Sequence, residues 1–168
     1  MTESTESTES TETTGYVPAG SHAVTPYLCC RGAADAIDFY VAVFGATEVG
    51  ERFVDAEGKV GHAELRFGDS VVMLAEEYPG YGMSPVDLAD VPVSINLYVP
   101  DIDAVVERAI ERGAKVTAPI SESFHGSRGA TLRDPFGHRW MVATQVREVS
   151  DEDYAKARDE FSRTTVTS

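Results

Sequence analysis

An internal repeat constrains the fold of this chain more than any other feature of its sequence. Each copy has a strand pattern, then the pattern of an amphipathic helix, then three short strand patterns. Gly45-Ala46 in the first copy matches Gly113-Ala114 in the second, an offset of 68 residues, and Gly68 matches Gly137 at an offset of 69. Two copies of one βαβββ unit predict an α+β fold built from two similar modules.

The predicted elements follow the same order in the two modules, which cover about 22–77 and 92–146. In the first module we expect a helix over 33–44, ended by Gly45, and strands over 22–31, 46–54, 59–67 and 70–76. In the second module we expect a helix over 102–112, capped by Asp101, and strands over 92–99, 115–119, 124–133 and 138–144. The segment 78–90, which is rich in Pro and Gly, is predicted to form a long loop or a lid.

The turn Asp134-Pro135-Phe136-Gly137 introduces the last strand of the repeat. Pro135 fixes its own φ and Gly137 can adopt a positive φ, so a sharp turn is expected here. In the strand that follows, alternation places Trp140 on one face and Met141 on the other. We therefore predict a closing hairpin at the centre of a curved sheet, with Trp140 in the core.

The ends of the chain differ from this central region, which we predict to be one domain over residues 20–146. Residues 1–19 repeat Thr, Glu and Ser without apolar groups, a composition typical of a disordered tail. Residues 147–168 are predicted to form a C-terminal helix and tail, because Ser150 followed by Asp153 is a typical helix start. We expect that helix to end near Arg163.

Charge excludes some classes of partner. The chain carries a net charge of −14, and residues 20–146 alone hold 18 acidic against 10 basic residues. Nucleic acid is not an expected partner, because phosphate binding needs clustered Lys and Arg. A membrane is not expected either, because no apolar run approaches the roughly 20 residues that a spanning helix needs. A cationic small molecule would suit this charge.

Cys29 and Cys30 are neighbours in the chain and cannot easily form a disulfide with each other, which favours a reducing cytoplasm.

The ordered set of motifs resembles the vicinal oxygen chelate superfamily, which includes glyoxalase I, extradiol dioxygenases and bleomycin and fosfomycin resistance proteins. The motifs that carry the resemblance, closest to the PhnB-like branch, are Val24-Thr25-Pro26-Tyr27-Leu28, Ala36-Ile37-Asp38-Phe39-Tyr40, Phe44-Gly45-Ala46, Gly61-His62-Ala63-Glu64-Leu65 and Asp134-Pro135-Phe136-Gly137-His138-Arg139-Trp140. The resemblance implies that the two modules form a curved, cup-shaped mixed sheet with helices on its convex side. It also implies that a small molecule binds on the concave side, and that the protein is a homodimer.

Strand alternation sorts the residues of this cup. Ala63, Leu65 and Phe67 should pack on a helix, which leaves His62 and Glu64 in the cup. Arg128, in a glycine-containing loop, is expected either to clamp an anionic group or to belong to a charged loop with an Arg–Asp134 surface pair. The predicted ligand-binding residues are Thr25, Tyr27, Met73, Ser94, Asn96, Tyr98, Arg128 and Met141.

Metal-dependent members of the superfamily hold an ion with four cup residues, usually His, Glu or Gln. The resemblance places Thr25, Met73, Ser94 and Met141 at these positions. Thioethers and neutral hydroxyls are poor ligands for a divalent ion that prefers oxygen and nitrogen. We therefore expect no cofactor, with a divalent metal as the disfavoured alternative, and a protein that binds a small molecule without the usual metal.

His62 and Glu64 support an alternative function. They are two residues apart on one strand, so both side chains lie on the same face. A carboxylate beside a His favours its protonated form, and the pair could act as general acid and base. The alternative is a glyoxalase-type lyase or isomerase in which His62 and Glu64 are the catalytic residues. A hydrogen-bonded polar wall without chemistry is the simpler interpretation of the same pair.

Overall fold

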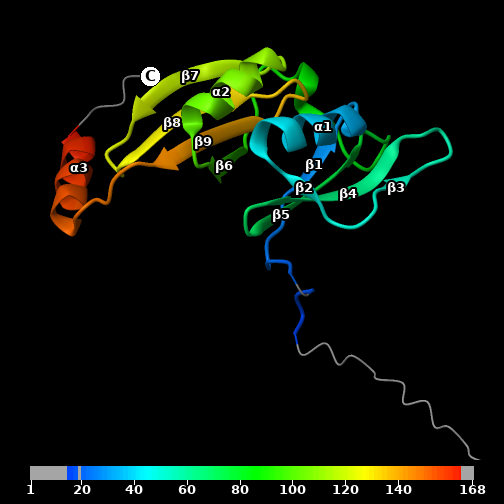
Figure 1. Ribbon diagram of the computed structural model, residues 1–168, viewed down its shortest axis with the longest axis horizontal. Helices are drawn as coiled ribbons and strands as arrows, with labels where there is room; N and C mark the ends of the chain where they lie inside the picture. Colours follow the sequence, from blue (N-terminus) through cyan, green and yellow to red (C-terminus); the bar gives the residue numbers. More distant parts are fainter. Residues whose placement is uncertain (1–14, 19, 164–168) are drawn as a thin grey trace, which may run out of the picture.

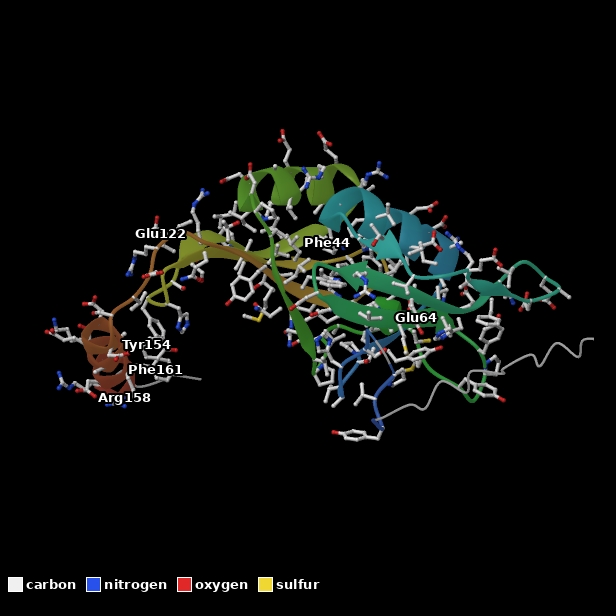
Figure 2. The ribbon with its side chains drawn as sticks, turned by 60° about the horizontal axis from the view of Figure 1, so that its bottom comes forward. Phe44, Glu64, Glu122, Tyr154, Arg158 and Phe161 are labelled. Atoms are coloured by element: carbon white, nitrogen blue, oxygen red, sulfur yellow. The ribbon has the colours of Figure 1, made fainter. Side chains whose placement is uncertain are left out.

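The computed structural model describes residues 15–18 and 20–163. Two open sheets lie side by side, and helices α1 and α2 cover the same face of both (Figures 1 and 2). The α+β architecture with two βαβββ modules is therefore confirmed. Most of the segment predicted to be a disordered tail, residues 1–14 and 19, lies outside the described residues.

Module 1 forms the first sheet. Its elements are β1 Tyr27–Cys30, α1 Ala33–Phe44, β2 Thr47–Glu48, β3 Phe53–Val54, β4 Val60–Phe67 and β5 Ser70–Glu76. The strand order is β1-β5-β4-β2, with β3 also paired to β4. Strand β1 runs parallel to β5, whereas the other pairs are antiparallel. The crossover through α1 is what makes the β1–β5 pair parallel.

Module 2 repeats this topology. Its elements are β6 Ser94–Tyr98, α2 Ile102–Glu111, β7 Lys115–Glu122, β8 Ser127–Arg133 and β9 Arg139–Gln145. The order β6-β9-β8-β7, with β6 parallel to β9, is that of module 1. As predicted, Asp101 caps α2, because its side chain accepts from the backbone N–H of Ala104. Helix α3, Asp151–Arg163, follows Ser150 and lies beyond the end of this sheet (Figure 1).

Two strands of module 1 are shorter than expected. The strand predicted over 22–31 is only four residues long, and it starts directly after Pro26, which has no N–H to give to a ladder. The strand predicted over 46–54 is divided into β2 and β3, with Gly50 between them at a φ of 72°. A positive φ does not fit an extended strand, so the chain turns at Gly50 and resumes pairing with β4 further along.

One hydrophobic core lies between the helices and both sheets. Its centre is Trp140 of β9, which is fully buried. The Trp140 ring centroid lies 4.8 Å from that of Phe44, 5.2 Å from Tyr40 and 5.6 Å from Phe67, all three from module 1. Because the aromatic cluster draws on both modules, neither module has a separate core.

The turn before β9 joins the modules through a buried carboxylate. Asp134 accepts hydrogen bonds from Tyr40 Oη at 2.7 Å, from Trp140 Nε1 at 2.8 Å, and from the backbone N–H groups of Phe136 and His138. Gly137 has a φ of 92°, and a Cβ there would lie 2.5 Å from the backbone of Pro85. No other residue fits at that position, so the turn and the inter-module segment interlock.

The inter-module segment, which was predicted to be a loop or a lid, is fastened to the rest of the fold. It contains one turn of 3₁₀ helix, η1 Pro85–Asp87. The guanidinium of Arg133 donates to the carbonyls of Pro85, Leu88 and Ala89 at 2.6–3.0 Å. These hydrogen bonds hold residues 85–89 against β8. Among the described residues, no helix is long and apolar enough to cross a membrane.

Removing one donor to Asp134 tests the link between the modules. We expect Tyr40→Phe to lower the free energy of unfolding by about 1–3 kcal/mol, because the buried carboxylate loses one of its partners. Urea denaturation measures the change, with Tyr81→Phe as the control, since Tyr81 is 94% exposed. Equal unfolding midpoints for the two variants would contradict the importance of this hydrogen bond.

The pH dependence of stability should report on His138, whose Nε2 lies 3.1 Å from the carbonyl oxygen of Cys29. Burial lowers the pKa of His138, while Asp134 partly offsets the effect and Arg133 adds to it. An unfolded His binds a proton below about pH 6.5. In the folded state His138 binds that proton only at a lower pH. The stability that His138 contributes above pH 6.5 should therefore be lost as the pH falls through the pKa of His138 in the folded state.

His138→Gln keeps a donor for Cys29 but cannot titrate, so its unfolding free energy should fall less than that of the wild type below pH 6.5. The measurement is urea denaturation between pH 7.5 and pH 5. His22→Gln is the matched control, because His22 is exposed. Identical slopes for the wild type and His138→Gln would show that His138 does not contribute.

Candidate functional site

The faces of the two sheets opposite α1 and α2, here called the helix-free face, carry most of the predicted site residues. On β4, Ala63, Leu65 and Phe67 are buried against the helices. His62 and Glu64 alternate with them and are half-buried on the helix-free face, where Figure 2 shows Glu64. Strand alternation, read from the sequence, therefore sorts this strand correctly.

In module 1, three side chains of the helix-free face form a chain of polar contacts. Tyr27 Oη lies 3.0 Å from His62 Nδ1, and His62 Nε2 lies 3.5 Å from Glu64 Oε1. Burial raises the pKa of Tyr27, and Cys29 raises it further. The Tyr27 hydroxyl therefore stays protonated at neutral pH and can donate to the imidazole. Met73 lies beside this chain, because it is the register partner of both Tyr27 and Glu64.

In module 2, the helix-free face combines aromatic and thioether groups with a few polar ones. Asn96 pairs in register with Met141, and Tyr98 is 64% exposed. Arg139 donates from Nε to Ser94 Oγ at 2.6 Å and from Nη1 to Asp90 at 2.9 Å. The exposed Tyr98 on the edge strand β6 and the exposed Met141 on the inner strand β9 present apolar surface to whatever binds there.

Two hollows open on this side of the molecule. A cavity of about 840 Å³ lies between β1 and β6, the facing edge strands of the two sheets. It is lined by four predicted residues, Tyr27, Ser94, Asn96 and Tyr98. A smaller hollow of about 330 Å³ lies on the sheet of module 2, and it contains Met141 and shares Asn96 and Tyr98 with the first. Five of the eight predicted ligand-binding residues thus lie in two adjoining hollows.

Three predicted residues lie elsewhere. Arg128 points to the helix-covered side, because it shares strand parity with the buried Ala130 and Leu132, and it forms a two-point ion pair with Asp103 of α2. Arg128 thus forms a charged surface pair, but its partner is Asp103 and not the expected Asp134, which is buried and accepts from Tyr40 and Trp140. Thr25 precedes β1, where its hydroxyl contacts the carbonyl of His22, and neither Thr25 nor Met73 lines a hollow.

Sequence reasoning missed one wall of the larger cavity. That wall comes from the inter-module segment, which contributes Met83, Pro85, Leu88, Val91 and Val93. The signal was present, since five apolar residues within eleven positions are unusual for a solvent-exposed loop. Their position next to β1 depends on Arg133 and Gly137, which are about 50 residues away in the sequence.

The four positions at which the resemblance would place a metal do not suit one. Thr25, Met73, Ser94 and Met141 offer two hydroxyls and two thioethers, which bind hard divalent ions weakly. The guanidinium of Arg139 lies against Ser94 and would repel a cation there. Among the described residues, no three His, Cys, Asp or Glu side chains are grouped so that they could hold a metal. The donor set therefore does not fit the usual ion.

Known proteins share both the sequence pattern and the fold. Residues 21–142 match the family model of the Glyoxalase/Bleomycin resistance protein/Dioxygenase superfamily. The protein Mb0911c of Mycobacterium bovis is 40% identical over 139 residues, which cover 80% of this chain and 91% of that protein. The match to the family model covers well over half of the chain, including both modules.

Solved structures have the same arrangement. TioX from Micromonospora sp. ML1 superposes with a TM-score of 0.57 at 26% identity, over 77% of this chain and 100% of TioX. The PhnB protein of Bacillus cereus superposes with a TM-score of 0.56 over 73% of this chain and 99% of that one. At 19% identity, the PhnB comparison shows a likeness of fold alone.

Metal analysis tests the donor-set argument. We expect protein incubated with Zn²⁺, Ni²⁺, Mn²⁺ or Fe²⁺ and then desalted to retain far less than one ion per chain, because hydroxyls and thioethers bind these ions weakly. Elemental analysis by mass spectrometry measures retention. Stoichiometric metal in the wild type that disappears in His62→Ala, but not in His22→Ala, would overturn the argument.

Proposed function

The chain belongs to the Glyoxalase/Bleomycin resistance protein/Dioxygenase superfamily, with PhnB-like structural neighbours, and we propose that it binds an amphipathic small molecule without the metal that many members use. The proposed binding site is the cavity of about 840 Å³ between β1 and β6, together with the adjoining hollow on module 2. Retention of the ligand, rather than its chemical conversion, is the function proposed.

The shape and lining of the cavity carry this proposal. Its volume is within the range of pockets that take ligands of drug size. Most lining side chains are apolar, and Tyr27 and Tyr98 offer aromatic surfaces on which a planar group could stack. Ser94, Asn96 and Arg139 supply a small number of polar contacts, which would orient the ligand rather than react with it.

Charge supports a basic ligand and argues against nucleic acid. The chain has a net charge of −14, and module 1 alone, over residues 20–77, holds ten acidic against four basic residues. Such a field attracts cations and repels phosphate backbones. A reducing cytoplasm is the proposed compartment, since both Cys29 and Cys30 are free thiols.

We further propose that two copies of the chain form a homodimer that closes the helix-free faces. Each face exposes large side chains in a single chain, including Tyr27 at 55%, Tyr98 at 64% and Met141 at 47%. Module 1 has a net charge of −6, whereas module 2, over residues 92–146, has six acidic and six basic residues. Pairing module 1 of one copy with module 2 of the other would keep the two acidic modules apart.

The contacts between Tyr27, His62 and Glu64 favour one alternative, a lyase or isomerase of the glyoxalase type. Tyr27 lines the cavity and also lies within hydrogen-bond distance of His62, so a proton could move between a bound substrate and the imidazole through the phenol. Glu64 would orient the imidazole, since its Oε1 lies 3.5 Å from His62 Nε2. In this alternative, His62 and Glu64 are catalytic and Tyr27 relays the proton.

A dye-binding experiment tests the binding function. Acridine orange, a planar cation, should bind the wild type and raise its melting temperature, and Tyr98→Ala should weaken binding by about tenfold because a stacking surface is lost. Fluorescence titration measures the affinity. Tyr81→Ala is the matched control, since Tyr81 is exposed and lines neither hollow.

A panel of planar cationic natural products, screened in the same way, extends the test beyond one dye. Absence of any binding, or equal loss in both alanine variants, would remove the support for a ligand site in the cavity. Consumption of a bound compound that stops in His62→Ala and Tyr27→Phe would instead favour the enzyme.

A further inference from the structure

Helix α3 leaves the second sheet in a direction that tight contacts fix. The side-chain amide of Gln145 donates to the carbonyls of His125 and Arg147, and the N–H groups of Val146 and Arg147 both donate to the carbonyl of Gly126. A Cβ on Gly126 would lie 2.4 Å from the Arg147 oxygen, so only glycine fits there. The Ser150 hydroxyl then caps the helix by accepting from the N–H of Asp153.

Beyond this anchor, α3 presents a largely apolar stripe that the described residues of its own chain leave mostly exposed. Tyr154, Ala157, Arg158 and Phe161 follow the i, i+3, i+4, i+7 spacing and share one face. The Tyr154 ring contacts Phe124 and His125, with centroids 5.6 Å and 5.8 Å away, but none of the helix residues is buried. Figure 2 shows Tyr154, Arg158 and Phe161 on the helix at the far end of the molecule from module 1.

The opposite face of α3 is of the kind that faces water. It carries Lys156, which pairs with Glu152 at 2.9 Å. A helix of 13 residues is marginally stable when isolated, so its stability normally comes from packing of its apolar face. A rigid anchor, a charged outer face and an uncovered aromatic stripe together indicate that the stripe docks on another molecule.

The other end of the same chain offers a matching surface. The β3–β4 hairpin projects from the end of the molecule opposite α3 (Figure 1). Phe53 on this hairpin is 71% exposed and Val54 is 52% exposed. When two copies lie antiparallel, α3 of each copy comes next to the hairpin of the other. One two-fold operation then covers both stripes and both hairpins.

The charged residue of the stripe favours the same docking partner, a second copy of the chain. Arg158 is a cation in the docking stripe, with 76% of its side chain exposed and a long 3.8 Å contact to Asp159. Module 1, to which the hairpin belongs, carries a net charge of −6. Helix α3 as a whole holds five acidic and three basic residues, so the complementarity is local: Arg158 on the stripe would meet Asp55 and Glu57 in the hairpin turn of a second copy.

We infer that α3 is a docking arm that packs its Tyr154–Phe161 stripe against the β3–β4 hairpin of a second copy. The inference rests on the homodimer in the proposed function, and it adds the segments that hold the dimer together at its ends. The arm also lies beside the smaller hollow, because Tyr154 contacts His125, which lines that hollow. Docking of a second copy would thus close the ligand site at its outer end.

Sedimentation equilibrium of the full-length protein tests the arm. Phe161→Lys and Phe53→Glu should each raise the dimer dissociation constant at least tenfold, because each replaces an aromatic contact by a charge at an apolar interface. The double variant should recover most of this loss, since the new lysine and glutamate would face each other across the interface. Glu152→Lys, which places the same lysine on the outer face of α3, should change the constant less than threefold.

The outcomes separate the arm from the rest of the proposal. If the wild type is a dimer and Phe161→Lys leaves its dissociation constant unchanged, the docking arm is excluded but the dimer is not. The same holds if the free-energy effects of Phe161→Lys and Phe53→Glu simply add in the double variant. A monomeric wild type up to 200 µM would overturn both the dimer and the arm. Acridine orange titration of the same samples reports independently on the ligand cavity.

Discussion

The carboxylate of Asp134 is the contact on which the arrangement of the two modules depends. It is 5% exposed, and it accepts from Tyr40, Trp140 and two backbone N–H groups. These four donors replace the water that burial removes, without which a charged group could not stay in the core. Tyr40 belongs to helix α1 of module 1 and Trp140 to β9 of module 2, so one side chain fixes how the sheets meet.

Local signals in the sequence were sufficient to predict most of the helices and strands of the fold. The apolar periodicity over 33–44 and the glycine after it correspond to α1, whose C-cap is Gly45 in the left-handed conformation. Period-two alternation placed Ala63 and Leu65 under the helices and Glu64 on the helix-free face. The repeat then supplied the topology, because two copies of one unit restrict how the strands can be ordered. These inferences succeeded because each depends on residues that are neighbours in the chain.

The remaining features depend on contacts between distant segments. The side chain of Arg128 was assigned from its glycine-rich surroundings, yet its orientation is decided by the parity of β8, where Ala130 and Leu132 pack under α2. The inter-module segment had the composition of a flexible loop, and its position depends on the hydrogen bonds from Arg133 and on the close approach of Gly137 to Pro85. No periodicity within 78–93 could reveal a partner about 50 residues away. For the same reason, the sequence predicted a cup but not that the larger cavity would lie where the two sheets meet.

The position of that cavity bears on how a member of this superfamily whose donor set does not suit a metal could select a ligand. Strands β1 and β6 are edge strands, so each has backbone groups on the side that faces the other sheet. One of these, the carbonyl of Cys29, is already satisfied by His138 of module 2. Other backbone groups on these edges could form hydrogen bonds to a ligand as a neighbouring strand would. The inter-module segment, Tyr27 and Tyr98 would then enclose the apolar part of the ligand. A metal ion would orient the polar atoms of a ligand by charge. This site would instead select among ligands by their shape, by stacking and by hydrogen bonds to the backbone. Such a site suits Met141 in the smaller hollow, because a thioether adapts to the outline of an apolar ligand.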